Sequence, residues 1–133
     1  DYKSRLNREG RSANTTWYQE FKKVDVGDDA WDDVVKINPA DGKKLGIKTG
    51  DTVRLTSTTG SIVAKAKLWE GVRPGTVAKC YGQGHWVYGR VASKVFGKEP
   101  RGGNNNEVLP AVYDRLSGST VRHAATRVKI EKI

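Results

Sequence analysis

Amide, hydroxyl and glycine residues gather in three polar segments of this 133-residue sequence, at residues 11–16, 83–86 and 103–106. Asn and Gln side chains each offer donors and an acceptor, which suits the mixed edge of a purine or a pterin. Glycine lets backbone amides approach a phosphate closely, and Trp86 or Tyr88 is available to cover a ring face. The alternative is that such clusters are ordinary turn residues. Three consecutive asparagines after two glycines exceed what a turn requires, so we predict a ligand site there.

Other kinds of chemistry find little support. Cys80 ends an apolar stretch and is predicted to be a buried thiol rather than a nucleophile. The two histidines, His85 and His123, lack the spacing of a metal site, and no second cysteine is present. Residues 82–84 lack the third glycine and the following helix of a dinucleotide fingerprint. The five aspartates of residues 25–33 lack the terminal glutamate of a calcium loop. We therefore expect no catalytic or metal-ligating residue.

The charge balance favours a partner that carries phosphate. Lys and Arg number 24 against 15 Asp and Glu, a net charge of +9. Residues 51–133 hold 14 basic and six acidic residues, so the excess lies in the second part of the sequence. A surface that is basic only for solubility is the alternative. With a mean hydropathy of −0.66 and no apolar run near the ~20 residues of a membrane span, we expect no membrane insertion.

The absence of Met and the start at Asp1 predict that the sequence is a fragment of a longer protein. No targeting signal is recognisable, and the localisation stays unassigned.

The residue types predict a mainly β fold. Val, Ile and Thr number 30 against six Leu, and β-branched residues favour strands. Strands are expected over residues 34–37, 52–57, 62–68, 76–80 and 121–133, with a hairpin turn at 58–61. Asn38 and Pro39 open a short helix that Gly46 ends. Residues 82–106 form a long loop with a short helix near 91–95, and residues 1–33 are irregular. Pattern counting gives a small barrel of about six strands.

The order of the motifs resembles a known family. Residues 37–53 read INPADGKKLGIKTGDTV, which is similar to the I-N-P-x-D-A-x-x-L-G-I-x-x-G-D-x-V segment of molybdopterin-dinucleotide-binding domains. These are the C-terminal domains of the DMSO reductase family of molybdenum and tungsten enzymes. Further motifs follow in the family's order at residues 73–75, 84–86, 103–106 and 126–130. The Gly-His-Trp and Asn-rich motifs look most like the arsenate, tetrathionate, thiosulfate and polysulfide reductase branch. Gly42 departs from the family's usual Ala.

The resemblance implies a six-stranded double-psi β-barrel, similar to the aspartate-decarboxylase-like fold, with short helices. The barrel is expected over residues 34–133, with the long loop at about 82–106 and residues 1–33 packed on it. The chain would be the last domain of the catalytic subunit of an anaerobic respiratory oxidoreductase, and not catalytic alone. It would orient a bis(molybdopterin guanine dinucleotide) cofactor with Mo or W, held jointly with upstream domains. The metal ligand and any iron–sulfur cluster would lie elsewhere, and an iron–sulfur electron-transfer subunit is the expected partner.

The same resemblance carries cofactor contacts onto nine positions of this sequence. They are Arg11, Ser12, Asn14, Gln83, His85, Trp86, Asn104, Asn105 and Asn106. The polar residues of the 37–53 motif are interpreted differently, because each has a backbone role as a helix cap or turn residue: Asn38, Asp41, Gly46, Gly50 and Asp51.

Two alternatives belong to other classes of protein, and a third lies within the same family. A small basic β-barrel that binds nucleic acid would use the +9 charge and exposed aromatic residues. A decarboxylase-type barrel enzyme would process itself at a Gly-Ser bond, for which only Gly60-Ser61 in a hairpin turn is present. A separate small subunit of a formylmethanofuran-dehydrogenase-like enzyme would carry the same domain. The absent Met and the reductase-like Asn loop favour the catalytic-subunit fragment over the last of these.

Overall fold

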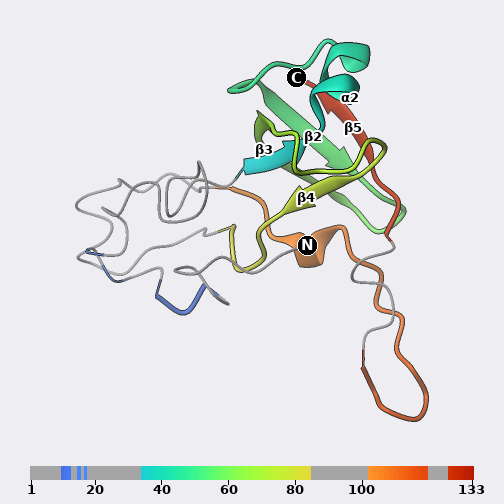
Figure 1. Ribbon diagram of the computed structural model, residues 1–133. Coiled ribbons are helices and arrows are strands. Elements are labelled where there is room, and N and C mark those ends of the chain that lie inside the picture. The colour runs from blue at the N-terminus through green and yellow to red at the C-terminus, as the bar shows by residue number, and fades with distance from the viewer. Residues whose placement is uncertain (1–9, 13–14, 16, 18–33, 85–101, 120–125) are drawn as a thin grey trace.

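The computed structural model describes residues 10–12, 15, 17, 34–84, 102–119 and 126–133 (Figure 1). The predicted helix near residues 91–95 lies outside these residues. Among them are five strands, one α-helix and one 3-10 helix: β1 Val34–Ile37, α2 Pro39–Leu45, β2 Thr52–Thr56, β3 Ser61–Leu68, β4 Val77–Lys79, η1 Asn105–Glu107 and β5 Lys129–Lys132. The predicted mainly β fold is confirmed. No helix in the described part of the chain has the length and apolar character to cross a membrane.

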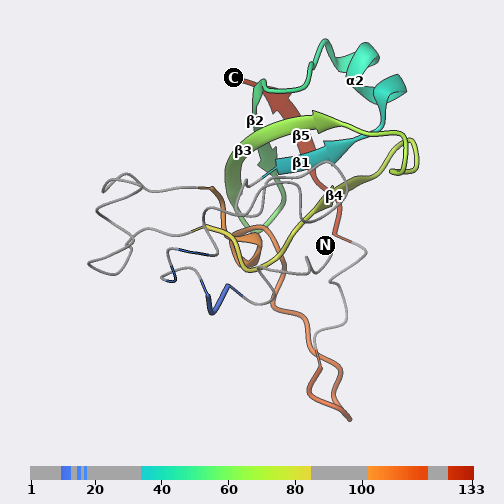
Figure 2. The ribbon, with the colours of Figure 1, turned by 60° about the vertical axis from the view of Figure 1, so that its left-hand side comes forward.

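The five strands form one sheet in the order β4-β1-β3-β2-β5 (Figure 2). Strand β1 runs parallel to β3, and the other neighbouring strands are antiparallel. Within the described residues, β4 and β5 are the two edge strands, and they do not pair with each other. The sheet is therefore one curved layer of five strands here, with α2 at one end of it (Figures 1 and 2).

The hairpin of β2 and β3 supplies most of the core. Leu55 pairs with Ile62, and Val53 pairs with Ala64, and all four side chains are buried. The residues between them along β3 face outwards, so the strand reads as an alternation of buried and exposed positions. The predicted alternation and the predicted turn are confirmed. Burial of this face is the main source of stability for the sheet.

Helix α2 begins and ends where the sequence predicts. The Asn38 side-chain oxygen accepts a hydrogen bond of 2.9 Å from the Ala40 amide. Gly46 has φ +67°, the left-handed conformation that ends many helices. Gly42 is buried, and a Cβ atom there would collide with the Leu68 side chain. The departure from the family's usual Ala is thus matched by a leucine side chain that fills the space of the missing methyl group.

We predict that Asn38→Ala lowers the free energy of unfolding by about 1–2 kcal/mol. Two bonds are lost, because Nδ2 of Asn38 also donates to the Val72 carbonyl oxygen over 2.7 Å. Urea unfolding measures the change. In the matched variant Asn38→Ser, the hydroxyl oxygen keeps the cap acceptor and the donor to Val72 is lost, so about half of the loss is expected. Equal losses in the two variants would contradict a role for the cap.

The last strand is shorter than the sequence predicts. We expected a strand over residues 121–133, but β5 covers Lys129–Lys132, and residues 126–128 are not in a strand. The part of the prediction over residues 120–125 lies outside the described residues. Val128 and Ile130 pack against the core as half-buried side chains. Strand β5 ends where its partner strand β2 begins, because Val53 pairs with Lys132.

A turn at residues 48–51 ties three strands together. The Asp51 carboxylate accepts a hydrogen bond of 2.8 Å from the Lys48 amide. It also forms an ion pair with Nζ of Lys132 at 2.8 Å. These two contacts, with that from Lys132 the stronger, lower the pKa of the Asp51 carboxyl. Its backbone carbonyl also accepts from the Ala66 amide. Asp51 is therefore a structural turn residue, as predicted.

Candidate cofactor-binding loops

Three loops meet through their glycine backbones. Gly10 has φ +83°, and a Cβ atom at this position would collide with the Gly82 carbonyl oxygen. Gly84 has φ +85°, and a Cβ atom there would collide with the Asn104 amide nitrogen. Backbone therefore packs directly on backbone at two points. The segments around residues 10–12, 82–84 and 103–106, which the sequence analysis singled out separately, form one cluster in the structure.

A buried lysine fixes the Asn-rich loop. Lys79, at the end of β4, is only 5% exposed, and its Nζ atom donates to the Gly103 carbonyl oxygen over 2.7 Å. Gly103 in turn lies against Ile62, since a Cβ atom on it would be 2.6 Å from the Ile62 Cβ atom. The loop is thus held between a charge-assisted hydrogen bond and the core, which restricts its conformation.

The three asparagines have different environments. Asn104 precedes η1, and its side-chain oxygen accepts a 3.1 Å hydrogen bond from the Asn106 amide, as a helix cap does. Asn105 is buried, and its Nδ2 atom donates to the Cys80 carbonyl oxygen over 3.4 Å. Asn106 is exposed. Asn104 therefore has the capping role of an ordinary turn residue. Asn105 is the residue of the triplet whose side chain is buried in the protein.

Two buried polar atoms in this cluster have no hydrogen-bond partner. They are Nε2 of Gln83, a donor, and Oδ1 of Asn105, an acceptor. An unpaired buried polar group costs about 1–3 kcal/mol, so native structures rarely leave one without a use. A donor and an acceptor on two loops in contact match the mixed edge of a pterin or a guanine. The residues present therefore fit a heterocyclic cofactor.

The other predicted contact residues are placed as follows. Arg11 is exposed and Ser12 is half-buried, with the Ser12 carbonyl oxygen accepting from the Thr15 amide in a turn. Asn14, His85 and Trp86 lie outside the described residues. Cys80 is buried, as predicted. In the described part of the chain, no three His, Cys, Asp or Glu side chains are grouped so that they could hold a metal ion.

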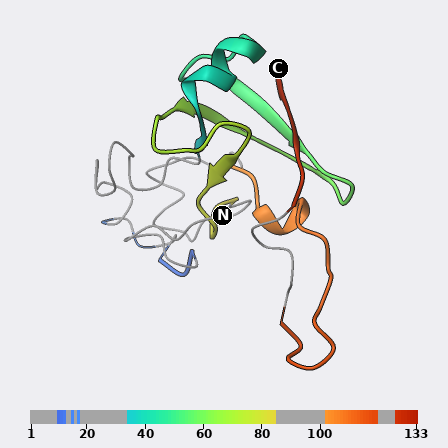
Figure 3. The same ribbon diagram turned by 45° about the vertical axis from the view of Figure 1, so that its right-hand side comes forward.

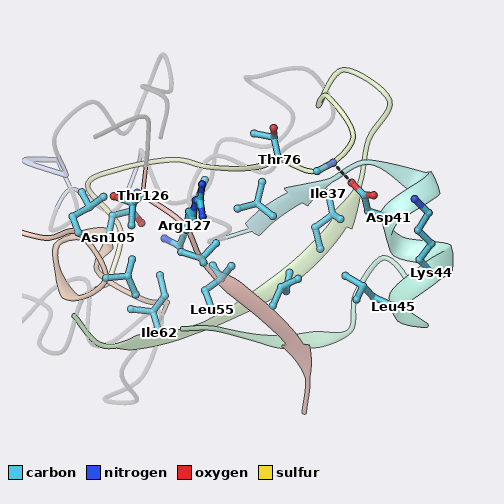
Figure 4. Close-up of a pocket in the computed structure, with 17 residues that line it drawn as sticks. Ile37, Asp41, Lys44, Leu45, Leu55, Ile62, Thr76, Asn105, Thr126 and Arg127 are labelled. Atoms are coloured by element: carbon cyan, nitrogen blue, oxygen red, sulfur yellow. Dashed lines mark hydrogen bonds between the residues drawn. The ribbon is translucent and has the colours of Figure 1, made fainter. Parts of the chain in front are cut away.

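A cavity of about 720 Å³ adjoins the loop cluster (Figure 4). It lies against the inner side of the sheet and is lined by residues of α2, β4, η1 and β5. Asn105, Thr126 and Arg127 gather at one end of it, and Asp41 lies at the other, where its side chain accepts a hydrogen bond from Gly75 over 2.6 Å (Figure 4). Asn105 is the residue that belongs to both the cluster and the cavity.

Three further residues lie beside the cluster or line the cavity without being predicted as contacts from the sequence: Lys79, Thr126 and Arg127. A signal for Lys79 was present, because a lysine inside a short predicted strand of apolar residues needs a partner when the strand is buried. Thr126 and Arg127 belong to a motif that the resemblance includes. Their place beside Asn105 depends on the path of the chain between η1 and β5, which the sequence does not indicate.

The fold and the loop cluster define a mainly β domain in which glycine-rich loops bring polar side chains together. Residues 7–125 match the family described as molydopterin dinucleotide binding domain, and the chain belongs to this family. It is a molybdopterin dinucleotide-binding domain. The predicted family is thereby confirmed.

The arsenate respiratory reductase molybdopterin-containing subunits of Shewanella sp. (strain ANA-3) and Chrysiogenes arsenatis are 62% and 63% identical to this chain. The matches cover 100% and 99% of the chain, but only 16% of each relative. The chain thus spans about one sixth of the length of these relatives. A solved structure, acetylene hydratase from Pelobacter acetylenicus, superposes with a TM-score of 0.59 at 18% identity. It covers 77% of this chain and 14% of its own, and it shares the fold.

Proposed function

We propose that this chain orients a bis(molybdopterin guanine dinucleotide) cofactor, carrying Mo or W, in the catalytic subunit of an anaerobic respiratory reductase. The observation that carries the proposal is the pair of unpartnered buried atoms, Gln83 Nε2 and Asn105 Oδ1, on loops that are in contact. The family membership and the two arsenate reductase relatives support it. When bound, the cofactor supplies the two-electron redox chemistry, and the protein supplies orientation and electrostatics.

The residues of the cluster have separate roles in this proposal. Gln83 donates to, and Asn105 accepts from, the edge of a pterin or guanine ring. Asn104 and Asn106 orient the loop and extend its polar surface. Arg11, Ser12 and Asn14 contact the dinucleotide. His85 and Trp86 belong, with Gln83, to the loop that faces the cofactor. The glycine backbones let amide groups come close to the pyrophosphate.

We also propose that residues 34–133 close into a six-stranded double-psi barrel, on which residues 1–33 pack. The curved five-stranded sheet and the fold shared with acetylene hydratase support the barrel. The contact of Gly10 with Gly82 supports the packing of the first segment. The partners in this proposal are the upstream domains of the same subunit and an iron–sulfur electron-transfer subunit. The substrate is an oxyanion such as arsenate, because the two relatives are named as arsenate reductases.

The parent activity is tested on the complete catalytic subunit. Elemental analysis should find about one Mo or W per subunit, and acid release should yield the oxidised pterin and a guanine nucleotide. With a reduced viologen dye as electron donor, the subunit should reduce arsenate. A subunit that contains neither metal nor pterin after anaerobic expression would contradict the proposal.

Gln83→Met tests the contact itself. Met has a similar shape without the amide, so the variant removes an unpaired buried donor. We expect the cofactor-free subunit to be as stable as the wild type or up to about 1 kcal/mol more stable. Pterin retention in the loaded subunit should fall about tenfold, because the contact to the ring edge is lost.

Glu70→Met is the control, because Glu70 is exposed in the turn after β3 and has no role in the proposed cofactor site. It should change both quantities less than Gln83→Met does. Unchanged pterin retention in Gln83→Met, at unchanged stability, would show that Gln83 does not contact the cofactor.

A further inference from the structure

A loop after η1 leaves the body of the domain. Residues 109–119, called the arm below, follow the buried Val108 and extend away from the strands in three views (Figures 1, 2 and 3). Three of its side chains are large, apolar and exposed: Val112 is 37% exposed, Tyr113 61% and Leu116 99%. An apolar group of this kind at the tip of a projecting loop is typical of an interaction surface.

The tip of the arm is ordered by its own hydrogen bonds. The Asp114 carboxylate accepts from the Leu116 amide over 3.0 Å and from the Ser117 amide over 2.7 Å. Its backbone amide donates to Ser119, and its carbonyl oxygen accepts from Gly118, which has φ +68°. The hydrogen bonds from Ser117 and Leu116 lower the pKa of the Asp114 carboxyl. The carboxylate therefore stays ionised, and able to accept these bonds, at a lower pH than an ordinary aspartate would. The turn therefore presents Leu116 outwards in a defined position.

We propose that the arm docks, through Val112, Tyr113 and Leu116, into an apolar pocket on the remaining part of the catalytic-subunit polypeptide. This inference rests on the proposed function, in which the chain is one part of a larger catalytic subunit. The chain makes up 16% of each arsenate reductase relative, so most of the polypeptide of those proteins lies outside the segment it represents. The arm supplies a surface for that part of the protein.

The charge of the arm favours an apolar protein pocket as its partner over an anionic partner. The chain has a net charge of +9, whereas residues 109–119 contain one acidic residue, Asp114, and one basic residue, Arg115. A surface that binds a nucleic acid or an anionic membrane carries several basic side chains. The arm instead offers a neutral, apolar surface, which complements an apolar pocket of protein.

The small size of the arm favours a partner on the same polypeptide over a second copy. Separate proteins that associate stably bury about 20–30 residues on each side. The arm has far fewer residues, but a tethered partner is present at an effective concentration in the millimolar range, for which a small contact suffices. A buried leucine and tyrosine at the centre of such a contact would provide most of its energy.

Docking of the arm can be measured by limited proteolysis, because trypsin cuts after Arg115, directly before Leu116. In the complete catalytic subunit, docking should protect this bond. We expect Leu116→Ser to raise the rate of tryptic cleavage at this site about tenfold, because cleavage follows the population of the open state. Leu116→Ile should retain protection. Val63→Ser, which changes an exposed apolar residue of β3, should leave the cleavage rate unchanged.

Equally fast cleavage of the wild type and Leu116→Ser would overturn the proposal, as would equally slow cleavage of both. It would also be overturned if Leu116→Ser changed only self-association or binding to lipid vesicles. Pterin content is measured on the same samples. A subunit that contains pterin but fails the cleavage test refutes the docking alone. A subunit that passes the cleavage test but contains no pterin refutes the proposed function and not the docking.

Discussion

Replacing Gly84 with alanine should lower the free energy of unfolding by about 2–4 kcal/mol and reduce pterin retention in the complete subunit at least tenfold. Gly84 has φ +85°, where an L side chain is strained. Its Cβ atom would also lie 2.8 Å from the Asn104 Cα atom and 2.8 Å from the Gly103 carbonyl carbon. These are backbone atoms, so the loops can only move apart, and this separates Gln83 from Asn105.

Gly50→Ala is the matched control. Gly50 has φ +93°, similar to that of Gly84, but nothing lies within 4 Å of the Cβ position. This variant should show only the conformational cost, about 1 kcal/mol, and no change in pterin retention. Urea unfolding and the fluorescence of the released, oxidised pterin measure the two effects. Losses of the same size in Gly84→Ala and Gly50→Ala would show that the contact between the two loops is unimportant.

The sequence predicts well those helices, strands and turns whose bounds are set by interactions between residues close together in the chain. Strand β1 at Val34–Ile37 has the predicted bounds, and the cap of α2 follows from Asn38 and its left-handed end from Gly46. The register of β2 and β3 follows from alternation and from a short turn. In each case, the deciding interactions join residues only a few positions apart, or residues paired through one turn.

The end of the chain shows where local reasoning fails. Val128 and Ile130 alternate, and this pattern predicted a long last strand. Among the described residues, β5 pairs with β2 alone, and its length is set by that partner, which covers Thr52–Thr56. A strand can extend only as far as a neighbour offers hydrogen bonds, and this limit is invisible in the sequence of the strand itself.

The candidate site could be predicted by its residue types but not by its geometry. Gln83 and Asn105 were singled out because amides after glycines suit a heterocycle. The close approach of their two loops depends on Gly84 packing against a backbone about twenty positions away, and on the bond from Lys79 to Gly103. Such long-range contacts carry no periodic signal. The role of a glycine as the point of closest approach emerges only from the structure.

The second large effect concerns the strand behind the site. Val35→Ala should lower the free energy of unfolding by about 2–3 kcal/mol, because it removes two buried methyl groups and leaves a cavity. Val35 is fully buried on β1, an inner strand of the sheet, where it pairs with Ala66 of β3 on one side and with Lys79 of the edge strand β4 on the other. Neighbouring main-chain bonds hold β1, so little collapse into the cavity is expected.

Val63→Ala makes the same chemical change on the outer side of β3, where Val63 is 41% exposed, and should cost less than about 1 kcal/mol. The two variants differ in burial and not in chemistry, so urea unfolding of both isolates the contribution of the core. Because β4 pairs with β1 and its Lys79 holds Gly103, we also expect Val35→Ala to speed hydrogen exchange in residues 102–107. If exchange there stays at the wild-type rate while stability falls, the Asn-rich loop is held independently of β1.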